Sequence, residues 1–210
     1  MLQLINFSKS FGNKALFNNI SINFHDNKIY YIYGENGVGK TTLFRCILGL
    51  ENFIGAIKKE SKEQFCVFDS TPFYLNLTGI DNLALFSKNK KVQELLKEKV
   101  IEYLPLDVLN KVKVRDYSLG EKKILSLILL LLLKPKIILL DEILNGLDQN
   151  NRRILFHSLN TLRRDSVILM SGHEKLYMEL GDEFLVVRNQ KLETIEKNEL
   201  SSLFTSPEGR

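Results

Sequence analysis

Nine consecutive residues have the types and spacing of a loop that binds a chain of phosphates: Gly34-Glu35-Asn36-Gly37-Val38-Gly39-Lys40-Thr41-Thr42. The glycines allow backbone N–H groups to curl around phosphate and point at it, together with the N-terminus of a following helix. We expect Lys40 to place its positive charge at the β and γ phosphates and Thr41 to give an oxygen to Mg²⁺. The loop therefore predicts nucleotide binding.

Two carboxylates follow a short apolar segment farther along the chain. Ile137–Leu140 predicts a buried strand, and Asp141 and Glu142 come at its carboxyl end, where ligands bind in open α/β sheets. We expect Asp141 to hold the Mg²⁺ shell and Glu142 to orient or deprotonate an attacking water. An Asp-Glu pair also occurs in solvated turns and helix caps, but its position after an apolar strand favours the catalytic interpretation.

A histidine follows a second apolar strand. Ser166–Met170 predicts that strand, and Ser171-Gly172-His173-Glu174 comes directly after it. At this end of the sheet His173 is expected to reach the γ-phosphate. His25 and His157 have no such context, so we interpret them as structural.

The segments around the loop predict the strand and the helix that must hold it. Lys28–Tyr33, before the loop, is rich in β-branched and aromatic residues, and Leu43–Leu48, after it, has the composition of a helix. Residues 1 to about 33 alternate short strands with turns, so we expect an antiparallel sheet leading into the loop. Further strands are expected near Gly55–Ile57 and Phe65–Phe68.

The middle of the chain changes to a helical pattern. From Asp81 to about Leu109 it is rich in lysine and leucine, with an interruption at Pro105, which predicts a small helical insertion. The residues that carry the helical spacing are Val92, Leu95, Leu96, Lys99 and Val100.

A second α/β stretch completes the chain. Here helices alternate with continuous apolar strands, which predicts a largely parallel sheet covered on both faces. The expected elements are a helix from Glu121, a helix over Asn151–Leu162, a closing hairpin over Glu183–Thr194 and a loose polar tail at Ser201–Arg210.

Composition narrows the class of protein. A chain of 210 residues with 44% hydrophobic and 26% charged residues suits one α/β domain with a sizeable core. The net charge of +4 is modest and its lysines are scattered, so no nucleic-acid partner is expected. The apolar segment Ile124–Leu133 is too short to cross a bilayer, which takes about twenty residues, and predicts a buried helix. Two cysteines and no visible secretion signal favour the cytosol.

The order of these motifs resembles the nucleotide-binding subunit of ABC (ATP-binding cassette) transporters over nearly the whole chain. In that family a motif similar to Leu-Ser-Gly-Gly-Gln precedes the strand with the two carboxylates, and Tyr117-Ser118-Leu119-Gly120-Glu121 has that place here. Asn145-Gly146-Leu147-Asp148 resembles the family's D-loop. His173 matches its switch histidine, and Phe11 has the place of the aromatic residue that stacks on adenine.

The resemblance implies a fold, ligands and partners. The fold would be α/β, with a P-loop NTPase (RecA-like) core, an N-terminal antiparallel β-subdomain and a helical subdomain at about residues 72–117, all in one domain over residues 1–210. Two such subunits, identical or different, would sandwich ATP and Mg²⁺ head to tail, with Ser118, the backbone at Gly120 and Asp148 among the nucleotide-binding groups. An integral membrane permease would hold the dimer at the inner face of the cell membrane, and the short insertion resembles exporter-type subunits.

Four positions depart from the family pattern. Leu119 replaces the first glycine of the signature pair, and Glu121 replaces its glutamine, which adds a carboxylate that would repel phosphate unless it is turned away. No glutamine occurs in Phe68-Asp69-Ser70-Thr71-Pro72, where the family has its Q-loop. Two interpretations stay open: Asp69 or Ser70 binds Mg²⁺ or water in its place, or the segment is a solvated loop. Ile143 replaces the proline that usually follows the catalytic glutamate.

Two other classes of function stay open on sequence grounds. One is a soluble cassette ATPase that acts on a ribosome, a nucleic acid or a metal-cluster assembly, although such proteins usually carry a second cassette or a long inserted coiled coil. The other is a GTPase or kinase that shares only the phosphate loop. The signature-like motif and the switch histidine disfavour it, and the chain has no evident guanine-reading Asn-Lys-x-Asp segment.

Overall fold

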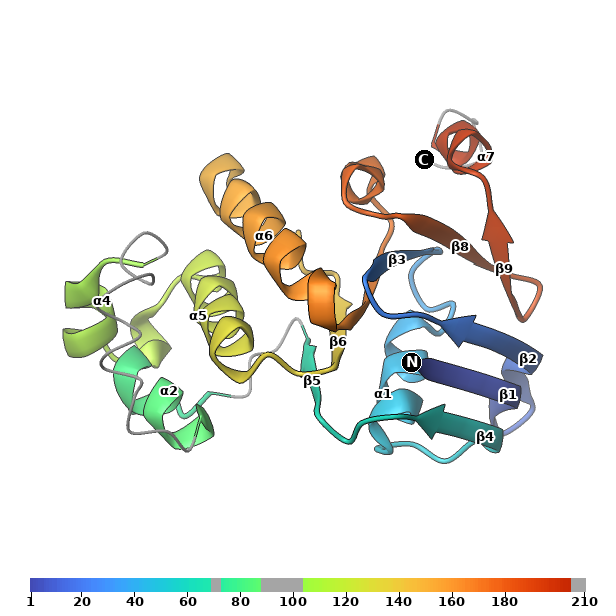
Figure 1. Cartoon of the computed structure of the whole chain (residues 1–210), viewed down its shortest axis with the longest axis horizontal. Helices are drawn as coiled ribbons and strands as arrows, with labels where there is room; N and C mark the ends of the chain where they lie inside the picture. The colour runs from blue at the N-terminus through green and yellow to red at the C-terminus, as the bar shows by residue number, and fades with distance from the viewer. Residues whose placement is uncertain (69–72, 88–103, 205–210) are drawn as a thin grey trace. The chain divides into compact units, whose positions relative to one another are not determined.

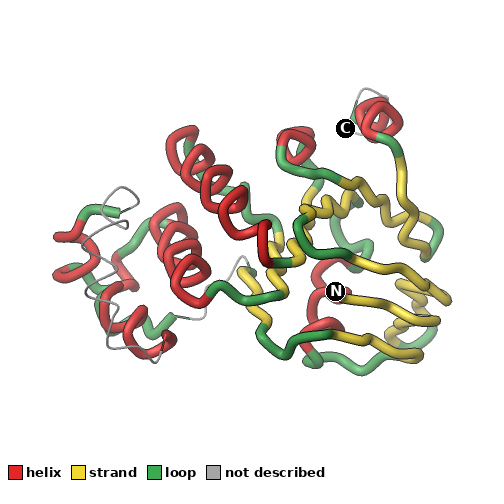
Figure 2. The backbone as a smooth tube through the Cα atoms, viewed as in Figure 1, coloured by secondary structure: helices red, strands yellow, loops and turns green. Residues whose placement is uncertain are grey.

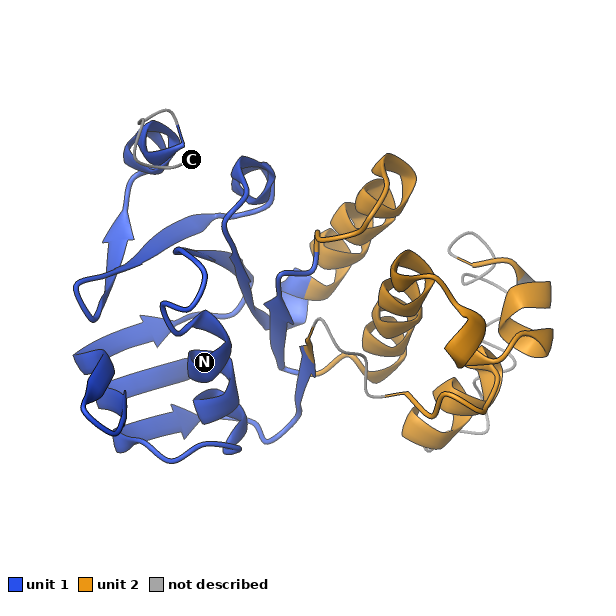
Figure 3. Cartoon of the chain, turned by 180° about the vertical axis from the view of Figure 1, so that it is seen from behind, with its two compact units in different colours: residues 1–66, 136–143, 163–210 blue, residues 67–135, 144–162 orange. Residues whose placement is uncertain are grey.

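The computed structural model describes residues 1–68, 73–87 and 104–204 (Figure 1). Three expectations lie outside this part of the chain: Asp69 and Ser70 of the loop without a glutamine, the helical spacing from Val92 to Val100, and most of the predicted tail. The described residues form two compact units, coloured separately in Figure 3. The first contains Met1–Cys66, Lys136–Ile143 and the chain from Arg163 onward; the second lies between Val67 and Pro135 and over Leu144–Leu162.

The first unit begins with a three-stranded antiparallel sheet in the order β2-β1-β4. Its strands are β1 (Leu2–Phe11), β2 (Lys14–Phe24) and β4 (Ile54–Lys59). Leu2, Leu4 and Phe7 of β1 are buried at 1% exposure or less. The alternation of buried residues is offset by one position between Leu4 and Phe7, where the register with β2 shifts. The register between β1 and β2 shifts between Lys9 and Ser10, which leaves Leu16 as the extra residue of a bulge.

A six-stranded sheet in the order β5-β6-β7-β3-β8-β9 completes the first unit. The strands β6, β7, β3 and β8 are parallel, and β9 pairs antiparallel with β8 as the predicted closing hairpin. Every residue of β6 and β7 is buried, which explains their continuous apolar sequence. The strands are β3 (Lys28–Tyr33), β5 (Gln64–Val67), β6 (Ile137–Asp141), β7 (Val167–Gly172), β8 (Glu183–Arg188) and β9 (Lys191–Ile195).

Helices connect these strands and make up most of the second unit, as Figure 2 shows by colour. In the first unit they are α1 (Lys40–Leu48), η3 (Arg163–Asp165), η4 (Lys175–Glu179) and α7 (Lys197–Leu203). In the second unit they are α2 (Gly79–Ser87), α4 (Leu106–Lys111), η2 (Val114–Asp116), α5 (Leu119–Leu133) and α6 (Gln149–Leu162). None of the helices in the described ranges is both long and apolar enough to cross a bilayer.

The predicted α/β class and the largely parallel sheet are confirmed, with three differences in detail. β3 pairs with β7 and β8 in the parallel sheet rather than extending the N-terminal antiparallel sheet, and four of its six residues are buried, as is usual for a strand in a parallel sheet. Helix α5 begins at Leu119, not at Glu121, since Ser118 caps it. Ser201–Leu203 are helical rather than loose, because Leu200 is fully buried and anchors α7.

Gly55 allows β4 to lie against β1. Its φ is +98°, and a Cβ there would come within 2.4 Å of the backbone oxygen of Asn6 and 2.5 Å of that of Ile5.

We predict that Gly55→Ala lowers the free energy of unfolding by about 3 kcal/mol or more, because both a strained φ and a clash with backbone arise. Denaturant unfolding measures the loss.

Gly49→Ala is the matched control, since Gly49 also has a positive φ (+78°) but no atom lies within 4 Å of its Cβ position. Its cost is expected to be about 1–2 kcal/mol. Equal losses in the two variants would contradict the close approach of β4 to β1.

Candidate functional site

The predicted phosphate loop connects β3 to α1 in the first unit, and both flanking elements form as expected. Glu35, Asn36 and Gly37 at its tip are exposed. Gly39 has a φ of +117°, and a Cβ there would lie 3.0 Å from the ring of Phe17. The loop therefore needs glycine at this position both for its backbone conformation and for its contact with β2.

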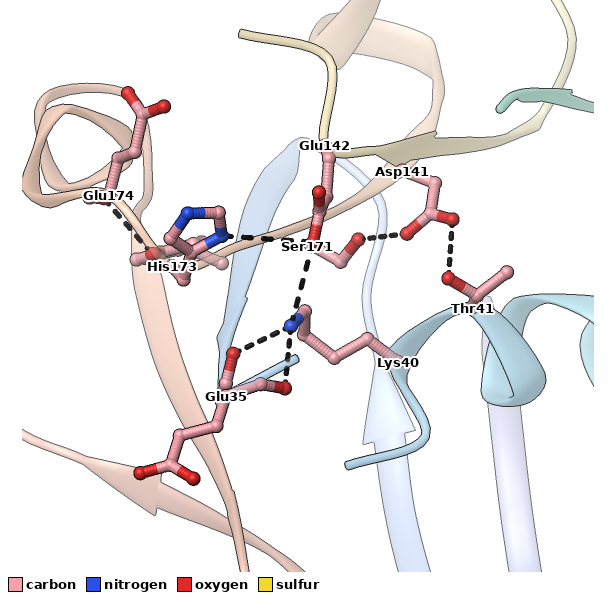
Figure 4. A network of polar contacts seen from close by, with 10 residues as sticks. Glu35, Lys40, Thr41, Asp141, Glu142, Ser171, His173 and Glu174 are labelled. Carbon is pink, nitrogen blue, oxygen red and sulfur yellow. Dashed lines mark hydrogen bonds and ion pairs between the residues drawn. The ribbon is translucent and has the colours of Figure 1, made fainter. Parts of the chain in front are cut away.

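Lys40, the first residue of α1, is 5% exposed and its ammonium group lies inside the loop (Figure 4). The Nζ atom donates to the backbone oxygen of Gly34 at 2.6 Å and to that of Glu35 at 3.0 Å. Burial lowers the pKa of Lys40 from its ordinary value, while the charges of Glu142 and Asp141 oppose the shift. The chain thus concentrates one positive charge where the loop curls.

The predicted metal pair is joined by a hydrogen bond. Thr41 Oγ1, in the first turn of α1, donates to Asp141 Oδ2 at 2.6 Å, and Asp141 is 6% exposed at the end of β6. Ser171 Oγ donates to the other oxygen, Oδ1, from the facing position of β7. Both oxygens of the buried carboxylate are therefore satisfied (Figure 4).

Glu142 and His173 also come together, as the sequence predicted. One carboxylate oxygen of Glu142, Oε1, lies 3.7 Å from Lys40 Nζ and 3.7 Å from His173 Nδ1 (Figure 4). Glu142 has a φ of +49°, and its backbone N–H donates to the oxygen of Ser171 at 3.1 Å. This turn directly follows β6, and the carboxylate lies beside the ammonium.

Phe11 lines a cavity of about 270 Å³ together with residues of the phosphate loop. The ring is 50% exposed at the end of β1. Leu16, the extra residue of the bulge in β2, also lines the cavity, as do Thr42 and Glu142. An aromatic ring at one side and the loop at the other suit a ligand with a flat base and a phosphate chain.

The signature-like residues lie in the second unit and form a helix cap. Ser118 Oγ accepts from the backbone N–H of Glu121 at 3.2 Å, and Glu121 Oε2 accepts from that of Ser118 at 2.7 Å, a capping box at the start of α5. The extra carboxylate is therefore turned back onto its own backbone. A Cβ on Gly146 would meet Leu119 Cδ2 at 2.7 Å, so the leucine side chain covers this glycine.

Asp148 and Gly120 also lie in this region of the second unit. Asp148 Oδ1 accepts from the backbone N–H of Asn151 at 2.8 Å and thereby caps α6. A Cβ on Gly120 would come within 3.3 Å of Asn151 Nδ2. Lys123, fully buried in α5, donates to the backbone oxygen of Asn145. The signature-like turn and the D-loop-like segment thus pack on each other within one unit.

The first-unit residues fit a Mg²⁺ ion and a triphosphate chemically. Thr41 and Asp141 offer the oxygen ligands that Mg²⁺ prefers, and they lie at the phosphate loop. Gly37 and Gly39 have positive φ values of +80° and +117°. Turns with such residues can form concavities of backbone N–H groups that bind anions.

Sequence reasoning missed one contributor to the first-unit site and one feature of the second unit. Ser171 was assigned to the segment before His173, without a role, although it bonds Asp141 across adjacent strands. The capping box of α5 was visible as Ser118-Leu119-Gly120-Glu121, a Ser followed by Glu three residues later, and would have given the correct start of the helix.

Comparisons with known proteins identify similar chains. The family model described as "ABC transporter" matches residues 17–145. The lantibiotic transport ATP-binding protein SrtF of Streptococcus pyogenes is 29% identical over 183 residues, which cover 82% of this chain and 80% of SrtF. The methionine import ATP-binding protein MetN of Clostridium tetani is 27% identical over 232 residues, which cover 100% of this chain and 72% of MetN. A solved ATP-binding subunit of an ABC transporter, 19% identical, has a TM-score of 0.86 over 98% of this chain and 100% of its own, so the fold is shared.

Ser171 is expected to support Asp141, the predicted metal ligand. We predict that Ser171→Ala raises the Mg²⁺ concentration for half-maximal nucleotide hydrolysis by about tenfold, because Asp141 loses one of its two hydroxyl donors and is less firmly oriented. A titration of hydrolysis with Mg²⁺ measures the shift.

Ser158→Ala provides the control, since Ser158 is also fully buried but donates to Ile154 within α6. Its Mg²⁺ requirement should match that of the unaltered protein. An unchanged Mg²⁺ requirement in Ser171→Ala would contradict a role for Ser171 in orienting Asp141.

Proposed function

The chain belongs to the ABC transporter family, and from this premise we propose that residues 1–210 form one cassette that hydrolyses ATP to drive a separate membrane permease. The observation that carries the proposal is the convergence of Lys40, Glu142 and His173 beside the Thr41–Asp141 pair. Nucleotide hydrolysis requires a loop that binds the phosphates, a pair of metal ligands, a carboxylate base and a group that contacts the γ-phosphate.

Each first-unit residue has a role in this proposal. Lys40 exchanges its contact with Glu142 for the β and γ phosphates, which frees the Glu142 carboxylate to accept a proton from the attacking water. His173 holds the γ-phosphate and, through Nδ1, the orientation of Glu142. Thr41 and Asp141 would hold Mg²⁺, which supplies charge neutralisation at the phosphates when bound. Phe11 stacks on the base, and the loop N–H groups from Gly34 to Thr42 bind phosphate oxygens.

A second cassette would complete the site. Ser118, the backbone at Gly120 and Asp148 are the groups we propose to face nucleotide held by the partner cassette, whether that partner is identical or different. The capping box supports this role, because it leaves the Glu121 carboxylate bonded to backbone rather than aimed at phosphate. It also leaves the Ser118 side chain on the surface at the N-terminus of a 15-residue helix.

The permease would dock on the second unit. Tyr74, Leu75 and Leu85 are 50–60% exposed there, on α2 and the loop before it, and apolar side chains of this size favour a protein partner. Docking would hold the cassette at the inner face of the membrane. We propose export on the brevity of the helical insertion, although MetN, a relative of similar identity, is named as an import protein.

Two substitutions separate binding of ATP from its hydrolysis. Glu142→Gln is expected to lower the hydrolysis rate by about 100-fold or more while ATP still closes a dimer, because the general base is lost but the cradle is kept. Lys40→Ala should abolish both hydrolysis and ATP-dependent closure. Phosphate release and light scattering measure the two properties.

Glu179→Gln, at an exposed position of η4, is the control for the loss of a carboxylate and should behave as the unaltered chain does. Undiminished closure in Lys40→Ala, or full hydrolysis in Glu142→Gln, would refute the proposed roles.

Docking of the permease has its own test. We predict that Leu85→Asp prevents co-fractionation of the chain with membranes that contain its permease, because a charge replaces an exposed apolar contact. Hydrolysis by the isolated chain should be unaffected. Co-fractionation that needs no permease, or that survives Leu85→Asp, would contradict this docking surface.

A further inference from the structure

Lys9 is a buried lysine on β1 that the proposed mechanism does not use. Its side chain is 6% exposed, although lysine rarely leaves solvent without a partner. The Nζ atom donates to Glu51 Oε2 at 3.0 Å and to the backbone oxygen of Asn52 at 2.7 Å. A buried ammonium with these partners has a fixed position, because moving it would leave a charge unpaired.

The same ammonium lies over the ring of Phe11, 4.3 Å from its centroid. Lys9 and Phe11 are two residues apart on one strand, so their side chains project from the same face of the sheet. The distance is within the range of an attractive cation–π contact. One face of the half-exposed ring is thus held by a buried charge, while the ring still lines the cavity of the phosphate loop.

Glu51 gives this contact a further anchor. It follows α1, the helix that begins at the phosphate loop and ends at Leu48. The ammonium therefore connects the ring at the base end of the cavity to the chain that leaves the phosphate-binding helix. A cation on one face also draws the ring's π-electron density toward itself, which makes the other face a better stacking surface for an electron-rich purine.

We propose that Lys9 is a positioning residue for base recognition, which holds the Phe11 ring against Glu51 and the loop after α1 so that its free face stacks on adenine. The inference rests on the proposed function, in which Phe11 contacts the base. It assigns to Lys9 a share of the affinity for the base and none of the affinity for phosphate.

The test compares ATP with tripolyphosphate, a probe that has the phosphates but no base. Lys9→Met should weaken ATP binding by about three- to tenfold and leave tripolyphosphate binding unchanged. In a Phe11→Ala background, Lys9→Met should have no further effect on ATP, since the ring through which it acts is gone. Isothermal titration calorimetry measures these affinities in the unaltered chain, the two single variants and the double variant.

Two further variants keep the test decisive. Lys58→Met is the matched control, because Lys58 is an exposed lysine on β4 of the same sheet, and its ATP affinity should be unchanged. Lys9→Gln removes the charge but retains N–H donors for Glu51 and Asn52, and it should show the same loss for ATP alone as Lys9→Met.

Four results would overturn the proposal: equal weakening of ATP and tripolyphosphate, unchanged ATP affinity, full additivity with Phe11→Ala, or loss of folding in both Lys9 variants, which would assign the ammonium to stability. Different results would show that the proposed function itself is wrong. In that case the unaltered chain would not bind ATP, or Lys40→Ala would bind it normally.

Discussion

The buried carboxylate of Asp141 is the constraint on which the site depends. A charge at 6% exposure is costly unless both oxygens are bonded, and Thr41 and Ser171 supply one hydroxyl each. These three residues come from α1, β6 and β7, so the two hydrogen bonds of one carboxylate fix the first turn of α1 against two neighbouring strands. The loop between Gly34 and Gly39 is thereby held at the carboxyl edge of the sheet, where ligands bind in such folds.

Charge balance within the first unit extends this arrangement. Lys40 is buried inside the loop, and backbone oxygens of Gly34 and Glu35 together with the Glu142 carboxylate stabilise it. Glu142, whose carboxylate lies near the ammonium, has a positive φ, a conformation that costs about 1–2 kcal/mol for a residue with a Cβ. Strain of this kind is common where a side chain must be aimed at a ligand.

Contacts within the second unit explain how the chain accommodates two of its departures from the family pattern, Glu121 and Leu119. Glu121 is compatible with the proposed anion-binding role of this turn because its carboxylate completes a capping box with Ser118. Leu119 directs its side chain over Gly146, and the absence of a Cβ on that glycine makes room for it. Both replacements therefore have local structural partners. Nothing in the described residues explains Ile143 in place of proline beyond its complete burial.

The phosphate loop, the Asp141–Glu142 pair and the parallel sheet were predictable from sequence, because each depends on contiguous residues or on local periodicity. The pairing of Ser171 with Asp141 was not, since it requires that β7 lie beside β6 in a particular register, which no local pattern specifies. The contact of Lys9 with Phe11 and Glu51 likewise depends on how a loop folds back on a strand. The sequence by itself determined which polar and charged side chains are present. Only the tertiary structure decided which of them bind one another, because a buried polar group needs a partner and that partner can be far away in the sequence.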